Sequence, residues 1–318
     1  MKEMAYLPCD LVILILSRLS VKTLSKFRCV CKLWLHLISD PHLLHLHSLR
    51  SKRNPLFFFS SIQYSNRVNT LHIKIYVCNP STQEYITLPK PTPSDADFIG
   101  FGYNSSTKEY KVVRMFIHWT LQLSDQRYQV LTLGSSSWRA VKGPQFNVHT
   151  MHTAFVNGAL HWMALGEGVY VVLAFDIETE EFNVIRFPEN FDHSRETNVL
   201  GEFGGLLCLT VAAPGGMDIW MLKDYENHVW AKEYSINLNT INPYDDMTAW
   251  YFNSRDIRDG KILIKSYRGE LGYYDPQSKS FKRFEIDEMI GMTQFSFYVE
   301  SLLSLGSRIK PQGISIGS

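Results

Sequence analysis

Two different hydrophobic patterns divide the chain near residue 50. In the first fifty residues, apolar side chains recur at spacings of three and four, which is typical of α-helices. From residue 56 onward, short aromatic and β-branched runs alternate with Gly, Asn, Asp and Pro, which is typical of antiparallel strands and turns. The pattern therefore predicts a small helical module followed by an all-β domain.

Three short helices are expected in the first module. Pro8 suits a first helical position, where its missing N–H removes no hydrogen bond, and an almost wholly apolar stretch follows it. Further helical patterns cover Val21–Cys31 and Lys32–Ile38, and Asp40-Pro41 ends the last one because the residue before proline avoids the helical region. A helix that is apolar nearly all round must be covered on more than one side. Because the unit is so small, part of its apolar surface must be buried by other residues, either those of the rest of the chain or those of a partner protein.

The β domain contains a weak internal repeat built from turn residues. Each copy has an Asn or Asp, followed six positions later by an aromatic residue. The Asn or Asp side chain can accept hydrogen bonds from backbone N–H groups ahead of it, so that the chain reverses and the aromatic packs on the returning strand. The pairs are Asn79 and Tyr85, Asn104 and Tyr110, Asp176 and Phe182, Asp224 and Trp230, and Asp275 and Phe281, with a looser copy from Thr132 to Trp138.

A second set of hairpin signals alternates with this repeat. Asn157-Gly158, Gly204-Gly205 and Asp259-Gly260 each precede an apolar strand, and such dipeptides favour tight hairpin turns. Two hairpins per unit, recurring about every 50 residues, are typical of four-stranded blades stacked radially. The β domain is therefore expected to be a propeller or propeller-like.

Composition narrows the classes of function. The 318 residues are 45% apolar and 20% charged, which excludes a disordered chain, and the net charge of +1 lacks the basic excess that non-specific nucleic-acid binding needs. The five cysteines show no disulfide framework, which is typical of a reducing compartment. No apolar run approaches the roughly 20 residues that span a bilayer, and no secretory leader is recognisable. We therefore expect a cytoplasmic or nuclear protein with no membrane or nucleic-acid partner.

Candidate metal sites are weak. Cys29 and Cys31 are two positions apart in a helical pattern, where they do not face each other, and are expected to be small buried residues. His42 and His45, with His36 and His47 nearby, could bind a metal weakly, but a solvated helix end is the simpler interpretation. We expect no metal and no cofactor.

An alternative function for the β domain is that of a propeller enzyme, such as a hydrolase or an oxidase, with a helical cap. Such an enzyme would gather acids, His or Tyr on one face of a central channel. The available acids include Asp176, Asp224 and Asp275, and their place in the turn repeat already accounts for them. We therefore expect no catalytic residues.

The first module resembles a known family. The run Leu7–Leu19, the pair Val21-Lys22 and the stretch Phe27–Trp34 resemble the plant type of F-box, which docks on a Skp-type adaptor and through it on the cullin of SCF (Skp–cullin–F-box) ubiquitin ligases. The family usually has an acidic residue near Ile13-Leu14 and Pro in place of Ser20. By resemblance, the positions that pack within the box or against the adaptor are Leu7, Pro8, Leu11, Ile15, Leu16, Leu19, Leu24, Phe27, Arg28, Val30 and Trp34.

The β domain carries a second resemblance. Tyr76–Thr82, Phe101–Asn104, Asn157–Trp162 and Tyr298–Leu302 are similar to motifs of the plant F-box-associated interaction domain, which is kelch-like and includes S-locus F-box relatives. The resemblance implies that this domain recruits a protein for ubiquitination. The family has a further strand pair before its first Asn-Pro-Ser-Thr motif, whereas only about 20 residues, without Gly, precede it here. The first blade is therefore expected to be truncated or rebuilt.

Together these observations predict an α+β multidomain protein. A small three-helix F-box is expected at residues 1–45, a linker at 46–55, an all-β propeller-like domain at 56–305 and a frayed tail at 306–318. The function implied is that of the substrate-recognition subunit of an SCF-type ubiquitin ligase, with an unknown protein target. Candidate target-binding loops, chosen for polarity and length, are residues 60–70, 118–127, 188–197 and 237–246.

Overall fold

The computed structural model divides the chain into two units, residues 1–91 with 292–318, and residues 92–291. The residues that it describes are 8–53, 56–60, 75–92, 96–119, 124–148, 153–166, 168–188, 191, 197–213, 215–241, 253–258, 260–265, 271–284, 294–298 and 316–317. None of the helices in these stretches has the length and apolar character needed to cross a membrane.

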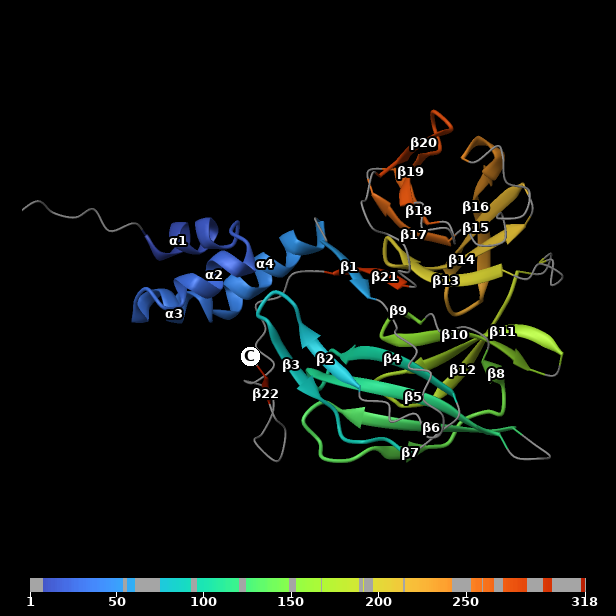
Figure 1. Ribbon diagram of the computed structural model, residues 1–318, viewed down its shortest axis with the longest axis horizontal. Coiled ribbons are helices and arrows are strands. Elements are labelled where there is room, and N and C mark those ends of the chain that lie inside the picture. Colours follow the sequence, from blue (N-terminus) through green and yellow to red (C-terminus); the bar gives the residue numbers. More distant parts are fainter. Residues whose placement is uncertain are drawn as a thin grey trace, which may run out of the picture. The chain divides into compact units, whose positions relative to one another are not determined.

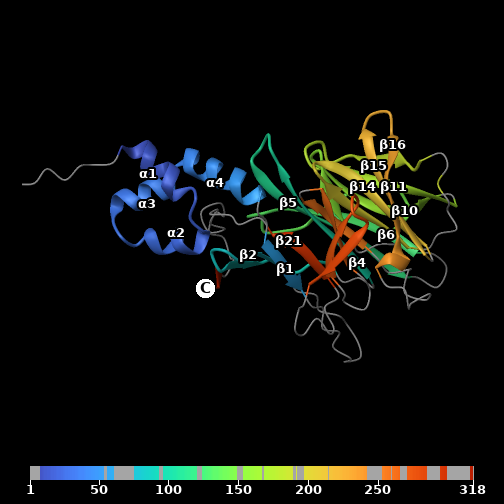
Figure 2. The ribbon, with the colours of Figure 1, turned by 90° about the horizontal axis from the view of Figure 1, so that it is seen from above.

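Four helices form the N-terminal module and lie together as one bundle (Figures 1 and 2). They are α1 (Cys9–Leu16), α2 (Val21–Phe27), α3 (Lys32–Ile38) and α4 (Pro41–Arg53). Their shared core consists of Ile13, Leu16, Val21, Leu24, Leu37, Ile38 and Leu43. Ser20 caps α2, because its Oγ accepts a hydrogen bond from the backbone N–H of Thr23 at 3.3 Å.

The fourth helix corrects the expectation of three. Pro41 ends the helical pattern of α3 but also begins α4, where a proline at the first position removes no hydrogen bond. The carboxylate of Asp40 caps α4 by accepting the N–H of His42 at 2.8 Å. Helix α4 covers most of residues 46–55, the stretch expected as a linker.

The first unit also holds two small sheets. Strand β1 (Leu56–Ser60) pairs with β21 (Gln294–Tyr298), and β3 (Glu84–Thr87) lies between β2 (Tyr76–Asn79) and β22 (Ile316–Gly317). Two small sheets thus occur around the first turn copy, where the sequence predicts a truncated or rebuilt blade. The tail, expected to be frayed, contributes β22.

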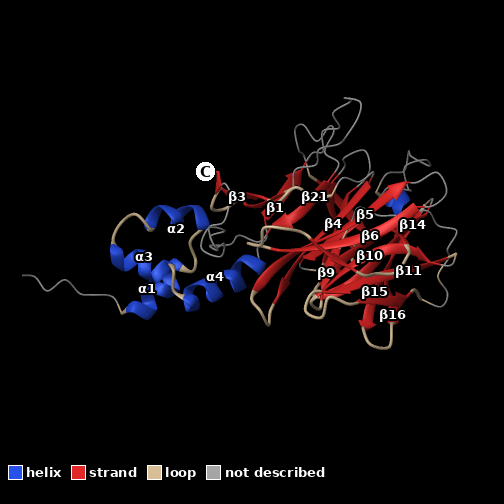
Figure 3. Cartoon of the chain, turned by 90° about the horizontal axis from the view of Figure 1, so that it is seen from below, coloured by secondary structure: helices blue, strands red, loops and turns tan. Residues whose placement is uncertain are grey.

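The described residues of the second unit form four antiparallel sheets, whose strands are drawn in red in Figure 3. Sheet 1 has β4 (Ala96–Asn104), β5 (Glu109–Trp119), β6 (Ser124–Thr132) and β7 (Arg139–Val141), and sheet 2 has β8 (Asn147–Val148), β9 (Ala154–Val156), β10 (Ala159–Gly166), β11 (Val169–Asp176) and β12 (Phe182–Arg186). Sheet 3 has β13 (Thr197–Phe203), β14 (Leu206–Ala213), β15 (Gly216–Asp224) and β16 (Val229–Asn237), which the short helix η1 (Leu238–Thr240) follows. Sheet 4 has β17 (Asn253–Arg258), β18 (Lys261–Lys265), β19 (Leu271–Asp275) and β20 (Ser280–Arg283).

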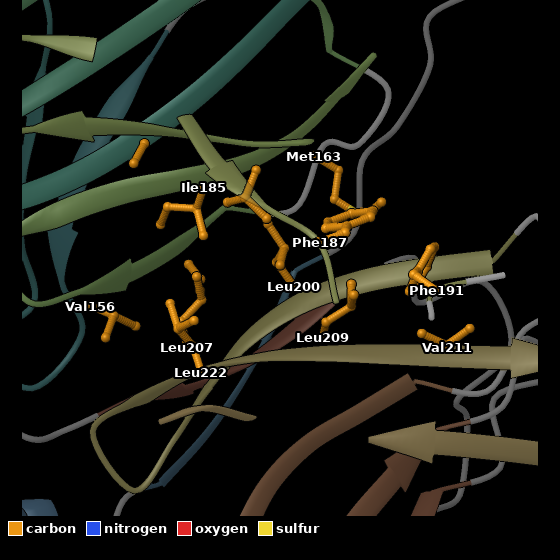
Figure 4. Packing of buried hydrophobic residues seen from close by; sticks show 13 residues of the cluster. Val156, Met163, Ile185, Phe187, Phe191, Leu200, Leu207, Leu209, Val211 and Leu222 are labelled. Carbon is orange, nitrogen blue, oxygen red and sulfur yellow. The ribbon is translucent and has the colours of Figure 1, made fainter. Parts of the chain in front are cut away.

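Each pair of consecutive sheets in this unit shares a buried apolar core. The core between sheets 1 and 2 includes Trp162 and Phe175, and the core between sheets 3 and 4 includes Ile219 and Ile262. Figure 4 shows the core between sheets 2 and 3, in which side chains such as Met163 and Leu209 point toward one another from the two sheets. The helices-then-strands order that the sequence predicts is confirmed.

The packing of sheets 1 and 2 is close enough to require a glycine. A Cβ atom at Gly100 on β4 would lie 2.8 Å from side-chain atoms of both Leu160 and Trp162 on β10. This separation is shorter than a van der Waals contact, so a larger residue would push the two sheets apart.

The repeated turns are confirmed. In all five copies the Asn or Asp side chain accepts a backbone N–H from two residues ahead, as Asp176 does from Glu178 at 2.8 Å. In four copies the aromatic lies opposite the residue that precedes the Asn or Asp, so that the rings of Phe175 and Phe182 are 4.8 Å apart. In the Asp224 copy a register shift places Trp230 opposite Leu222. The second signal also holds, because Asn157 and Gly158 both have positive φ in the turn between β9 and β10.

Candidate functional site

An exposed apolar stripe runs along α1. Leu11, Leu14 and Ile15 are 48%, 41% and 52% exposed, and Pro8 at the helix start is exposed as well. Leu11 is three residues from Pro8 and from Leu14 and four residues from Ile15, so these side chains lie around one side of the helix, while Ile13 and Leu16 are turned into the bundle core. The helical module therefore buries one side of α1 and leaves the other side exposed.

A second exposed apolar group lies at the α2–α3 turn and on α3. Val30, Leu33 and Leu35 are 62%, 54% and 47% exposed, while Trp34 is half-buried with its ring 4.7 Å from that of Phe27. Among the described residues, six of the thirteen exposed large hydrophobic side chains belong to residues 11–35. This concentration indicates an interaction surface rather than the scattered exposure that is normal for a protein surface.

Basic side chains surround this surface. Residues 9–40 contain five Lys or Arg against two Asp, and Arg18, Lys22, Lys26 and Lys32 are all exposed. A partner for this surface would therefore combine apolar side chains with a negative charge.

The residues predicted to contact the adaptor divide into three groups. Pro8, Leu11, Ile15 and Val30 are exposed, Leu19, Phe27, Arg28 and Trp34 are partly buried, and Leu16 and Leu24 belong to the bundle core. Leu7 lies outside the described residues. Leu14, Leu33 and Leu35 are exposed apolar residues that the resemblance did not single out. Helical spacing from Leu11 could have indicated Leu14.

One expectation about side chains in this module was wrong, and a second holds in part. Cys29 and Cys31 are exposed, because α2 ends at Phe27 and both cysteines lie in the turn before α3. His36, His42 and His45 are exposed as expected, but His47 is buried, and its Nε2 lies 3.1 Å from the carbonyl oxygen of Leu19, which ties α4 to the turn between α1 and α2. Over the described ranges, no cluster of three or more His, Cys, Asp or Glu side chains could hold a metal ion.

The Asp residues of the turn repeat in the β domain accept hydrogen bonds from backbone N–H groups of their own turns. Hydrogen bonds from the side chain and backbone of Asn227 hold the pKa of Asp224 below its usual value, and backbone N–H groups of Ser278 and Gln277 do the same for Asp275. Each carboxylate thus accepts hydrogen bonds within its own turn, as does that of Asp176. This arrangement removes the support for a propeller enzyme built on these acids.

A buried histidine connects sheets 2 and 3. His161 on β10 is fully buried, with its Nε2 2.7 Å from the hydroxyl of Tyr225 and its Nδ1 3.2 Å from the carbonyl oxygen of Ala154. Burial lowers the pKa of His161 to about 4, although the backbone hydrogen bonds oppose the shift. A neutral imidazole bonded at both nitrogens in this way is a structural link between two sheets.

An ion-pair group connects sheets 1 and 2. The Lys111 Nζ on β5 donates to Glu180 Oε1 at 2.8 Å and to the carbonyl of Ile177 at 2.7 Å, while Arg139 pairs with the other oxygen of Glu180. Burial tends to raise the pKa of Glu180, but hydrogen bonds from Arg139 and Lys111 outweigh it and hold the pKa below its usual value. Lys111 is buried, so its charge depends on these partners.

Two known families match this chain. The F-box domain matches residues 5–46, and the F-box associated beta propeller domain matches residues 47–305. The chain belongs to the F-box proteins with an F-box associated beta propeller domain. Members of this family are non-catalytic adaptor subunits, and an F-box implies binding to a Skp1-type adaptor.

Similar proteins occur in Arabidopsis thaliana. The F-box protein DOR is 28% identical over a match that covers 89% of this chain and 88% of the relative. F-box protein At5g65850 is also 28% identical and covers 71% of this chain and 70% of its own length, and F-box protein At3g07870 is 26% identical with 87% and 86% covered.

Proposed function

We propose that this chain is the substrate-recognition subunit of an SCF-type ubiquitin ligase. Its helical module binds a Skp-type adaptor and, through it, a cullin, and its β domain recruits a protein target for ubiquitination. The observation that carries the proposal is the uncovered apolar side of α1, formed by Pro8, Leu11, Leu14 and Ile15. We place this activity in the cytoplasm or nucleus, where the adaptor and cullin work.

The proposed role needs no catalytic residue in this chain. A receptor that holds the target and the adaptor together raises the effective concentration of target lysines near a ubiquitin-loaded enzyme. The turn-bound acids of the β domain and the exposed apolar surface of the helical module both agree with such a role.

The adaptor-binding surface consists of the exposed members of the predicted set, Pro8, Leu11, Ile15 and Val30, together with Leu14, Leu33 and Leu35. Leu16 and Leu24 contribute indirectly, because they hold the helices in place from within the bundle. A few residues near the centre of an interface commonly supply most of the binding free energy, about 2 kcal/mol or more each.

Co-expression of the full chain with a Skp1-type adaptor, followed by gel filtration, tests the proposal. The double variant Leu11→Asp with Ile15→Asp should lose co-elution, because it places two charges in the apolar contact. Val169→Asp is the matched control, since Val169 is equally exposed, at 53%, but lies on β11 in the other unit. Failure of the folded unmodified chain to co-elute with the adaptor would overturn the proposal.

A further inference from the structure

A cavity of about 500 Å³ lies in the second unit, between the end of β12 and the hairpin that joins β15 to β16. Its apolar walls are formed mainly by Trp220 and Trp230 of sheet 3 and by Phe187 and Pro188, which follow β12 of sheet 2. The cavity is thus built from two consecutive sheets, and we call it the β12–β16 groove.

The tryptophans of the groove are held rigidly. Both pack against the buried core between sheets 2 and 3, and the Trp230 Nε1–H donates to the carbonyl of Arg186 at 2.8 Å, which fixes the two walls relative to each other. The Lys232 Nζ lies 5.1 Å from the centre of the Trp220 ring, a favourable cation–π distance that keeps this indole in place. Rigid aromatic walls bind a ligand with little loss of conformational entropy.

The described lining of the groove carries positive and no negative charge. Its ionisable residues are Arg186 and His228, and none of the lining residues that the structure describes is an Asp or Glu. Arg186 is exposed, and no ion pair joins its guanidinium to a carboxylate within the described part of the chain. A guanidinium beside apolar walls is suited to a bidentate contact with a carboxylate.

The described acids on the turn that carries His228, and Asp218 on β15, are not among the residues that line the groove. Asp224 and Glu226 belong to the same turn as His228 but do not line the groove. Asp224 is occupied, because it accepts the backbone N–H groups of Glu226 and Asn227 and the side-chain amide of Asn227 at 2.8 Å. Asp218 is likewise held by Lys232 and Ser235.

We propose that the β12–β16 groove binds an acidic peptide segment of the target, in which Asp or Glu stands beside a proline or an aliphatic residue. The carboxylate pairs with Arg186, and the apolar residue packs against Trp220 and Trp230. The segment binds in an extended conformation, because β12 and β16 are the end strands of their sheets and can pair with an added chain. This inference rests on the proposed function, since it names the class of segment that the receptor recognises.

A nucleic acid fits the groove less well. One Arg and one His supply too few phosphate contacts for tight binding to a polyanion, and the chain as a whole carries a net charge of only +1. An oligonucleotide therefore belongs in the test as a competing ligand.

The test measures fluorescence polarisation with labelled synthetic peptides of about twelve residues, using the full chain in complex with its adaptor. One peptide alternates Asp and Glu with Leu and Pro, a second has Asn and Gln at the acidic positions, and a third has Lys there. We expect the acidic peptide to bind about tenfold more tightly than the neutral one, and the Lys peptide to bind most weakly.

Substitutions in the groove sharpen the result. Arg186→Glu should weaken binding of the acidic peptide by about tenfold or more and should favour the Lys peptide instead. Val229 is half exposed in the groove, so Val229→Asp should weaken and Val229→Lys should tighten binding of the acidic peptide, without disturbing a core. The matched control is Lys282→Glu, which reverses an exposed charge on the end strand β20 of sheet 4.

Several outcomes would overturn the inference. Equal binding of the three peptides, or equal affinities of Arg186→Glu, Val229→Asp and the unmodified chain, would remove the groove as an acidic-peptide site. Tighter binding of a thymidine oligonucleotide than of the acidic peptide, at the same groove, would replace the peptide by a nucleic acid. Groove variants should still co-elute with the adaptor, so loss of peptide binding alone would leave the proposed function intact. Conversely, a chain that binds the acidic peptide but fails to bind the adaptor would overturn the proposed function and leave the groove as a peptide-binding site.

Discussion

The helical module and the second unit differ in how their large apolar side chains are divided between core and surface. In the helical module, seven buried residues form one small core, and six large apolar side chains of residues 11–35 remain exposed. In the second unit, three larger cores lie between consecutive sheets, and each of sheets 2 and 3 contributes to two of them. The β unit thus buries most of its apolar surface between its sheets, and its five described exposed large hydrophobics are spread over residues 101–229. The helical module has six within residues 11–35, which indicates a surface that another polypeptide covers.

The first prediction tests whether the buried cores stabilise the β unit, by removing a side chain from one of them. Trp162 is fully buried between sheets 1 and 2, so Trp162→Ala should lower the free energy of unfolding by about 4 kcal/mol, through lost burial and a cavity. Urea denaturation followed by circular dichroism measures the change. Val169→Ala, on an exposed position of β11, should change it by less than about 0.5 kcal/mol. Equal effects of the two variants would contradict the core assignment.

The second prediction concerns the charged link between sheets 1 and 2. Lys111→Met leaves Glu180 with Arg139 alone and should cost about 3 kcal/mol near neutral pH. Because the pKa of Glu180 is lowered in the folded state, its stabilising contribution is complete above the ordinary Glu pKa of about 4.3 and is lost as the pH falls through the folded value. Denaturation at several pH values should therefore show the unmodified chain and Glu180→Gln converging in acid. A constant difference down to the lowest pH at which both fold would contradict this account.

The third prediction concerns the pH dependence of the free energy of unfolding that the buried residue His161 causes. His161 has a folded pKa of about 4, below its ordinary value of about 6.5, so the unfolded chain binds a proton between these values that the folded chain does not. The contribution of His161 is complete above pH 6.5 and should fall by about 3 kcal/mol as the pH approaches 4. His161→Gln, which keeps hydrogen-bonding capacity toward Tyr225, should remove that part of the pH dependence. Val169→Ala supplies the control, because it changes an exposed side chain that carries no ionisable group and should leave the pH profile unchanged.

Local features of this fold were predictable, and long-range ones were not. The turns at Asn104 and Asp176 depend on hydrogen bonds to residues two and three positions ahead, so the sequence spacing contains the whole interaction. The exposure of Cys29 depends on where α2 ends, which periodicity alone does not determine.

The candidate sites divide in the same way. The apolar side of α1 follows from helical spacing, so Leu11 and Ile15 could be placed from the sequence. The β12–β16 groove depends on the contact of Trp230 with Arg186, which lies 44 residues away and in another sheet. Local sequence patterns do not predict a contact over this separation. The candidate loops chosen for polarity therefore included Pro188 but neither tryptophan.

The smallest predicted effect tests whether the helical module folds by its own local signals before a partner covers it. Ser20 stands where the family usually has Pro, and its Oγ caps α2 through the N–H of Thr23. Ser20→Ala should destabilise α2 by about 1 kcal/mol, which is about fivefold faster amide hydrogen exchange in residues 21–27 of the free chain. Adaptor binding should slow exchange in both proteins, because the module is then held from outside as well. Thr87→Ala, at the end of β3, should leave exchange in this segment unchanged. Unchanged exchange in Ser20→Ala would show that the cap contributes nothing, and that the order of α2 comes from the core around Val21 and Leu24 alone.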